Sequence, residues 1–146
     1  MECIKALPSG TNRYAVGDVL EFDTIDRLTN LATRTVSRVT RADDDRVEFN
    51  RGAKVVDQMG GVSKDRFGTK EPANVAEPSE LAAGKRWRSA FTNTRPDGVV
   101  ASNFWDFHVV ALEDVSVPAG TFKAYRVTGE GWSTFPGGAH SLAQTH

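Results

Sequence analysis

The chain contains one cysteine, Cys3, among its 146 residues. A single cysteine cannot form an internal disulfide, so the small disulfide-stapled scaffolds are excluded and cysteine usage does not indicate a cellular compartment. A hydrophobic core must therefore hold the fold together.

Long apolar runs are also missing. The longest uninterrupted run extends from Val109 to Leu112, far short of the roughly 20 apolar residues with which a helix crosses a bilayer. The first six residues lack the apolar segment of a signal peptide, so we expect no signal peptide in this chain. The sequence predicts a protein that does not span a membrane.

Neither sign of charge dominates. The chain has 18 Lys and Arg residues against 19 Asp and Glu residues, which gives a formal net charge of −1. Such a chain has no overall field that attracts nucleic acid or an anionic membrane. We therefore expect no nucleic-acid partner.

Motifs that carry chemistry are scarce. No G-x-S-x-G elbow presents a serine nucleophile, and the glycine pairs at 60–61 and 137–138 lack the lysine and hydroxyl of a phosphate-binding loop. The aspartates at 43–45 lack the glycine and the distal glutamate of an EF-hand, which favours a solvated turn. The residue types that bind zinc lack the close spacing of zinc sites; they are Cys3, His108, His140 and His146. We expect no metal ion and no cofactor.

The composition that remains is that of a globular domain. Apolar residues make up 39% of the chain and charged residues 25%, both close to globular averages. A chain of this length buries roughly 70% of its unfolded surface when it folds. We predict a single domain over residues 1–146.

A turn of the form x-Pro-x-Gly occurs three times, at Leu7–Gly10, Arg95–Gly98 and Val117–Gly120. The proline sets φ to about −65°, and the glycine can take the left-handed conformation that completes a three-residue hairpin loop. Extended segments with alternating residues flank the middle turn at 86–93 and 99–101, which predicts a hairpin.

Aromatic and β-branched residues occupy both faces of residues 104–112, which predicts the central strand of a sheet. We expect this strand to bend near Glu113 and Asp114, to reach the third turn, and to pair with a returning strand at 121–127. Further strands are predicted at 19–25, 33–41, 46–49 and 53–57. The predicted fold is mainly β: a single curved antiparallel sheet, or a half-barrel of hairpins.

The apolar rhythm disappears between Ser63 and Glu80, which predicts a long surface connection with one helical turn at 78–83. This connection is either a functional flap or a seam between two halves. The segments Tyr14–Leu20 and Leu81–Trp87 both read apolar-Ala-small-Gly-charged-x-apolar, and each opens a series of strands. Either two degenerate repeats or coincidence explains the likeness.

The segment Asp114–Val127, with the sequence DVSVPAGTFKAYRV, resembles a hairpin of the form D-V-x-V-P-A-G-T-F-x-A. That hairpin occurs in families of exported, β-rich bacterial proteins and lipoproteins, which are domains of unknown function. The resemblance implies a twisted antiparallel sheet in a periplasmic or cell-envelope setting, and it carries no catalytic residue to transfer. Because such families continue through further strands, we expect either a truncated chain or a C-terminal tail that pairs elsewhere.

The aromatic residues gather in the second half of the chain. They are Trp87, Phe91, Phe104, Trp105, Phe107, Phe122, Tyr125 and Trp132. Such residues favour strands and form β cores, but they also line concave sheets that hold apolar ligands. For the ligand interpretation, the predicted binding residues are Trp87, Phe91, Trp105, Phe107 and Tyr125.

A carboxylate two residues from an imidazole can orient it for acid–base catalysis, and Asp106 and His108 have this spacing on one face of the central strand. No nucleophile accompanies them, so a structural polar pair explains the spacing equally well. We assign no catalytic residue from the sequence.

Three functions follow, in order of preference. The first is a non-enzymatic binding or structural module of the bacterial cell envelope that holds an apolar ligand on its concave face. The second is a protein-interaction domain that uses an open sheet edge to recruit a partner strand or a second copy of itself. The third is an enzyme that uses His108 and Asp106. Cys3 adds the hypothesis of a lipid anchor, against that of an ordinary thiol.

Overall fold

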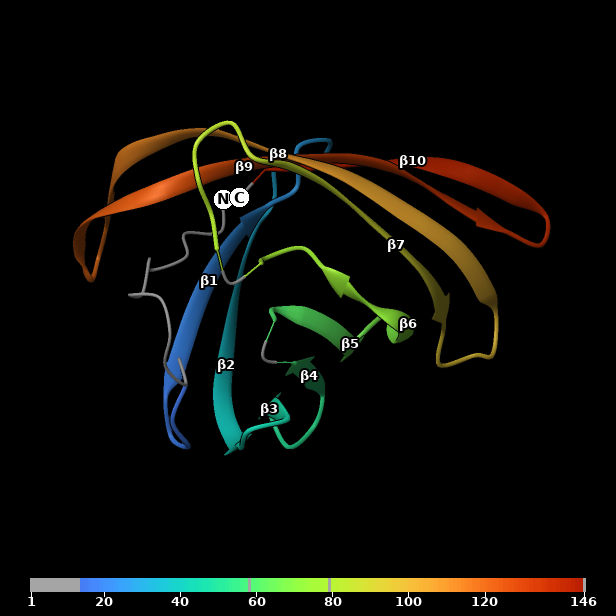
Figure 1. Ribbon diagram of the computed structural model, residues 1–146, viewed down its shortest axis with the longest axis horizontal. Coiled ribbons are helices and arrows are strands. Elements are labelled where there is room, and N and C mark those ends of the chain that lie inside the picture. The colour runs from blue at the N-terminus through green and yellow to red at the C-terminus, as the bar shows by residue number, and fades with distance from the viewer. Residues whose placement is uncertain (1–13, 58, 79, 146) are drawn as a thin grey trace.

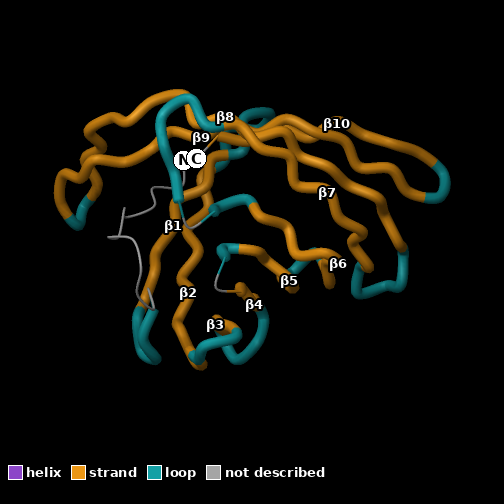
Figure 2. Tube along the Cα trace, in the orientation of Figure 1, coloured by secondary structure: helices purple, strands orange, loops and turns teal. Residues whose placement is uncertain are grey.

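The computed structural model describes residues 14–57, 59–78 and 80–145, and within these ranges every regular element is a strand (Figures 1 and 2). The strands are β1 (Val19–Ile25), β2 (Ala32–Ala42), β3 (Arg46–Phe49), β4 (Lys54–Asp57), β5 (Gly61–Asp65), β6 (Gly68–Val75), β7 (Arg86–Thr94), β8 (Val100–Val117), β9 (Gly120–Phe135) and β10 (Gly138–Thr145).

The ten strands form one antiparallel sheet in which each strand pairs with its neighbours in sequence, in the order β1 to β10. The short strands β3 to β6 lie in the bend between the long β1–β2 hairpin and strands β7 to β10 (Figure 1). The sheet curves without closing into a barrel. The prediction of a single curved antiparallel sheet is confirmed.

The predicted strands at 19–25 and 46–49 agree with β1 and β3 in both bounds. The central strand is longer than predicted, because β8 runs from Val100 to Val117. Its irregularity also lies elsewhere: the register shifts between Val109 and Ala111, not at Glu113 and Asp114. A bulge of this kind bends the strand and increases the local twist of the hairpin.

The prediction of a long unstructured connection over residues 63–80 is wrong for most of that segment. Strands β5 and β6 occupy residues 61–65 and 68–75, and the predicted helical turn at 78–83 does not form over its described residues. The alternation of apolar and polar residues is missing from this segment because polar side chains occupy buried positions in it. The ammonium of Lys70 is almost fully buried and lies 2.6 Å from the Asp65 carboxylate.

Two of the three Pro-x-Gly turns fall within the described residues. At Arg95–Gly98 the N–H of Gly98 donates to the Arg95 carbonyl and Gly98 has φ 86°, as the hairpin prediction requires. At the other turn the loop is Pro118 and Ala119 alone, since Val117 pairs directly with Gly120. The turn at Leu7–Gly10 lies outside the described residues.

A glycine turn connects the start of β1 to β2. The N–H of Asp18 donates to the Ala15 carbonyl at 3.0 Å, and Gly17 takes the left-handed conformation with φ 97°. The Gly17 N–H then donates to the Val39 carbonyl, and the Val39 N–H donates to the Asp18 carbonyl, both at 2.9 Å. Both backbone groups of Val39 are thus held by this turn.

The same arrangement recurs at the start of β7. The N–H of Lys85 donates to the Ala82 carbonyl at 3.0 Å, and Gly84 has φ 85°. The Gly84 N–H donates to the Val109 carbonyl, and the Val109 N–H donates to the Lys85 carbonyl, both at 2.9 Å. The two segments that look alike in sequence therefore make the same backbone bonds, which favours the repeat over coincidence.

Each of the two valines lies at the centre of a separate hydrophobic cluster. The first cluster consists of Val39, Val47 and Phe49, with Tyr14, Leu20, Ala42 and Val56 packed against it. The second consists of Phe107, Val109 and Val127, with Ala76, Leu81, Trp87, Trp105 and Tyr125 packed against it. Val39 is 1% exposed and Val109 is fully buried. The curved sheet has one core for each glycine turn.

The second cluster depends on a close approach of β8 and β9. Gly129 is the cross-strand partner of Phe107, and the phenyl ring of Phe107 lies over it. A Cβ built on Gly129 would be 2.7 Å from Cε1 of Phe107. Only glycine leaves this ring in its place.

We expect Gly129→Ala to lower the free energy of unfolding by about 1–3 kcal/mol, because the added methyl group overpacks the core against Phe107. Urea denaturation followed by circular dichroism measures the change. Gly138→Ala is the matched control, since its Cβ would make an ordinary contact of 3.4 Å with Phe135. Equal effects of the two substitutions would contradict this account of the core.

Candidate functional site

The predicted ligand-binding residues lie on the inner, concave face of the sheet. The indole of Trp87 stacks on Phe107 with ring centroids 5.0 Å apart, and Trp105 stacks on the same phenyl ring at 5.8 Å. Tyr125 packs against the cluster that these rings belong to. Phe91 is buried on the same face of β7 but lies outside that cluster. The structure thus brings four of the five residues together.

The chain itself covers much of this aromatic cluster. The indole N–H of Trp87 donates to the Val75 carbonyl at 2.7 Å, and Ala76 and Leu81 from the segment between β6 and β7 pack against the rings. Phe107 is left 2% exposed. The cluster therefore contributes chiefly to the core of the domain.

Polar side chains continue the inner face beyond the aromatic cluster. The hydroxyl of Ser89 donates to Oδ1 of Asn74 and accepts a bond from the Val75 N–H. Nδ2 of Asn93 donates to the Phe67 carbonyl, whereas its buried Oδ1 has no partner within the described residues. The inner face is thus apolar near β8 and polar near β6.

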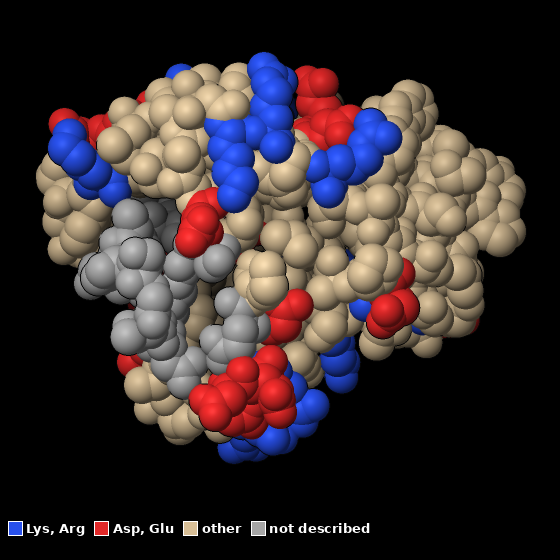
Figure 3. Space-filling view, viewed as in Figure 1, with Lys and Arg blue, Asp and Glu red and all other residues tan. Residues whose placement is uncertain are grey.

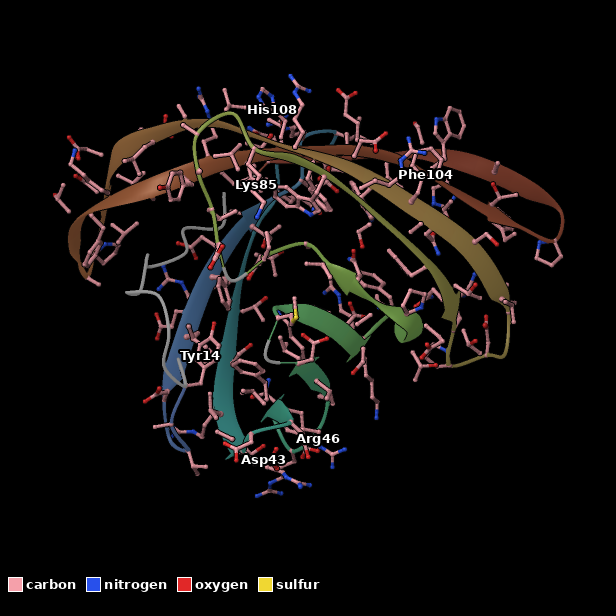
Figure 4. The ribbon with its side chains drawn as sticks, in the orientation of Figure 1. Tyr14, Asp43, Arg46, Lys85, Phe104 and His108 are labelled. Atoms are coloured by element: carbon pink, nitrogen blue, oxygen red, sulfur yellow. The ribbon has the colours of Figure 1, made fainter. Side chains whose placement is uncertain are left out.

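The outer face of β7, β8 and β9 carries three cross-strand rows of side chains. The rows are Arg86–His108–Thr128, Arg88–Asp106–Glu130 and Ala90–Phe104–Trp132. In Figure 4, His108 projects from β8 on the outer side of the curve. The register thus brings together residues from three strands that are far apart in sequence.

One ion pair fixes the middle row. Nε and Nη2 of Arg88 donate to the two carboxylate oxygens of Asp106 at 2.7 and 2.6 Å. The guanidinium also lies over the ring of Phe104, 4.4 Å from its centroid. A bidentate pair that is also stacked on an aromatic ring holds both side chains in one orientation.

A hollow of about 560 Å³ opens on this face; we call it the outer hollow. Arg86, Asp106, His108, Thr128 and Glu130 line it from the outer face, and Trp87 and Phe107, whose side chains belong to the inner cluster, complete its lining. Within the described residues, the side chains of Arg86, His108 and Glu130 make no hydrogen bond or ion pair, so their polar groups face solvent. Only His108 is singled out by the sequence pattern; Arg86 and Glu130 are marked by nothing except the alternation along each strand.

The structure places Asp106 and His108 on one face, as their spacing predicts, but does not join them. The Asp106 carboxylate is occupied by Arg88, whose hydrogen bonds and positive charge lower the pKa of Asp106. Within the described chain, Asp106 makes no hydrogen bond to the imidazole of His108, so it does not orient His108 for acid–base catalysis.

Within the described part of the chain, no three side chains of His, Cys, Asp or Glu lie close enough to hold a metal ion. Two of the residues considered for zinc, Cys3 and His146, lie outside the described residues. The hypothesis of a lipid anchor concerns Cys3 and therefore also falls outside them. None of the described segments is a helix long and apolar enough to cross a membrane.

Comparison of the chain with protein-family models, curated proteins and solved structures gives no match. The resemblance of Asp114–Val127 to hairpins of exported bacterial proteins stays a prediction.

Replacing Arg88 tests the electrostatics of the outer face. In Arg88→Gln we expect the pKa of Asp106 to rise toward its ordinary value, because the cation that lowers it is gone. Because the pKa of Asp106 is lower in the folded state, the Arg88–Asp106 pair stabilises that state at pH values above the pKa of Asp106 in the unfolded chain. This stabilisation is lost as the pH falls through the pKa of Asp106 in the folded protein.

Carbon-13 NMR titration of the Asp106 carboxyl group measures the shift. Arg95→Gln serves as the control, since Arg95 pairs with Asp97 in the β7–β8 turn. An unchanged pKa of Asp106 in Arg88→Gln, or an equal change in the control, would disprove the assignment.

Proposed function

We propose that this protein is a non-enzymatic protein-binding module that takes an extended segment of a partner protein as an additional strand along β10. The observation that carries the proposal is the open edge of β10, an eight-residue strand that pairs with β9 on one side only within the described sheet. Unpaired N–H and C=O groups along such an edge are a template for another strand.

The backbone bonds of β7 and β8 determine which amides of β10 face outward. The N–H of Val109 donates to the carbonyl of Lys85, the residue just before β7, and antiparallel pairs alternate between bonded and non-bonded residues. Carried through the register of β8, β9 and β10, this alternation directs Gly138, His140, Leu142 and Gln144 toward β9. The outward-facing amides are those of Ala139, Ser141, Ala143 and Thr145.

The two edges of the sheet are protected to different degrees. On β1, Glu21 and Asp23 place charges along the strand, and both lie within ion-pair distance of Arg34 in β2. Strand β10 contains no Lys, Arg, Asp, Glu or Pro. Charged residues and proline are the usual protection of an edge, so β10 is the edge better suited to pairing. At its end, Arg27 beside β1 donates to the Thr145 hydroxyl.

The resemblance of the β8–β9 hairpin supports a cell-envelope setting, in which the partner would be another envelope protein. An apolar ligand on the inner face has less support, because Trp87 is bonded to Val75 and Leu81 packs on the same cluster. Mass spectrometry of the native protein would reveal such a ligand.

The proposal is tested with peptides selected from a random library displayed on phage. We expect the selected peptides to perturb the NMR signals of Ala139, Ser141 and Ala143 and to bind Ala143→Pro at least about tenfold more weakly. Proline removes an outward N–H, which is worth about 1 kcal/mol as a hydrogen bond, and its ring obstructs the incoming strand.

Ala143→Val is the matched control, because valine keeps the N–H and suits a strand. Both variants should fold, since proline at an outward-facing edge position removes no bond within the sheet. Peptides that bind the proline and valine variants equally, or a selection that yields none dependent on the edge, would rule out strand addition at β10.

A further inference from the structure

The outer face of β7, β8 and β9 has features that strand addition at β10 does not use. Trp132 on β9 is 50% exposed, although an indole is among the largest apolar surfaces a side chain can bury. Its cross-strand partner is Phe104, whose ring carries the Arg88 guanidinium. An aromatic platform thus stands beside the outer hollow.

The platform and the hollow are continuous along β9. Glu130 lines the outer hollow, and Trp132 follows it two residues later on the same face, about 7 Å further along the strand. On β8, Asp106 lies between Phe104 and His108, and its carboxylate binds Arg88 of β7. One extended ligand can therefore contact the indole and the polar groups together.

The charges around the outer hollow balance. Arg86 and Arg88 face Asp106 and Glu130, and the surface view shows basic and acidic residues interspersed (Figure 3). A phosphorylated ligand would meet the free carboxylate of Glu130, and a cationic ligand would meet the guanidinium of Arg86. A neutral ligand avoids both repulsions.

The hydrogen-bonding groups of the outer hollow narrow the class of ligand further. Arg86 offers only donors and Glu130 only acceptors, whereas His108 and Thr128 offer both. Hydroxyl groups donate and accept, so a polyhydroxylated ligand satisfies all of these side chains. The C–H face of a sugar ring is apolar and flat enough to stack on an indole, as the exposed Trp132 requires.

We propose that the outer face of β7–β9 binds a neutral saccharide, with one ring stacked on Trp132 and hydroxyl groups bonded in the outer hollow by Arg86, His108 and Glu130. Arg88 and Asp106 are positioning residues, because their bidentate pair fixes the floor between the hollow and the platform. This site lies on the face of the sheet, whereas strand addition uses the unpaired backbone groups of β10.

The test uses an array of neutral oligosaccharides of glucose, galactose, mannose and N-acetylglucosamine, followed by calorimetry with the oligosaccharide that binds best. We expect Trp132→Ala and Glu130→Gln each to weaken binding at least tenfold. Leu112→Ala is the matched control, since Leu112 is 48% exposed on β8 beyond the site. It should bind like the unmodified chain.

NMR spectra of each variant establish that it is folded, which is expected because both Trp132 and Glu130 are exposed. Absence of binding to every neutral oligosaccharide would overturn the proposal. So would binding that survives Trp132→Ala, or binding that inorganic phosphate displaces. The outcome is independent of the β10 proposal, because saccharide binding is measured through Trp132 and Glu130 on β9 and strand addition through peptides at the β10 edge.

Discussion

The fold depends on a backbone clamp that occurs twice, in which a glycine turn binds both the N–H and the carbonyl of one buried valine. The clamp on Val39 of β2 fixes where β1 begins, and the clamp on Val109 of β8 fixes where β7 begins. The register shifts directly after each valine. The shift bends the strand, so a cluster forms on the inner side around the clamped residue. Curvature, strand starts and both cores therefore have a common local cause.

The alternation of the antiparallel ladder determines which side chains lie on each face of the sheet and which amides lie at its edge. Because consecutive strands are also neighbours in the sheet, the bond from Val109 to Lys85 determines the orientation of every residue through to β10. The same parity places Trp87 and Phe107 inside, His108 and Glu130 outside, and the amide of Ala143 at the edge. The two proposed sites are thus consequences of one register.

Much of the fold could be predicted from the sequence, and less of the candidate sites. Alternation and turn residues indicated β1, β3 and the β7–β8 hairpin, because apolar side chains recur at inward positions there, among them Leu20, Phe49 and Trp87. They failed for β5 and β6, where Lys70 faces inward beside Asp65. Strand β10 was not predicted, since its weakly apolar sequence carries little periodicity. Trp132 was recognised as an aromatic residue, but only the register across β8 and β9 shows that it stands exposed beside Glu130.

The two halves use the same clamp, yet only the second builds a hollow on its outer face. In the first half a bidentate pair joins Arg34 on β2 to Asp23 on β1, comparable with Arg88 and Asp106 in the second. The difference lies in the third strand: β3 has four residues, whereas β9 has sixteen. Strand β3 ends at Phe49, the partner of Val39, whereas β9 continues beyond Val127, the partner of Val109, and contributes a third residue to each outer row. We infer that the length of β9, more than the residue types on β7 and β8, produces the outer hollow.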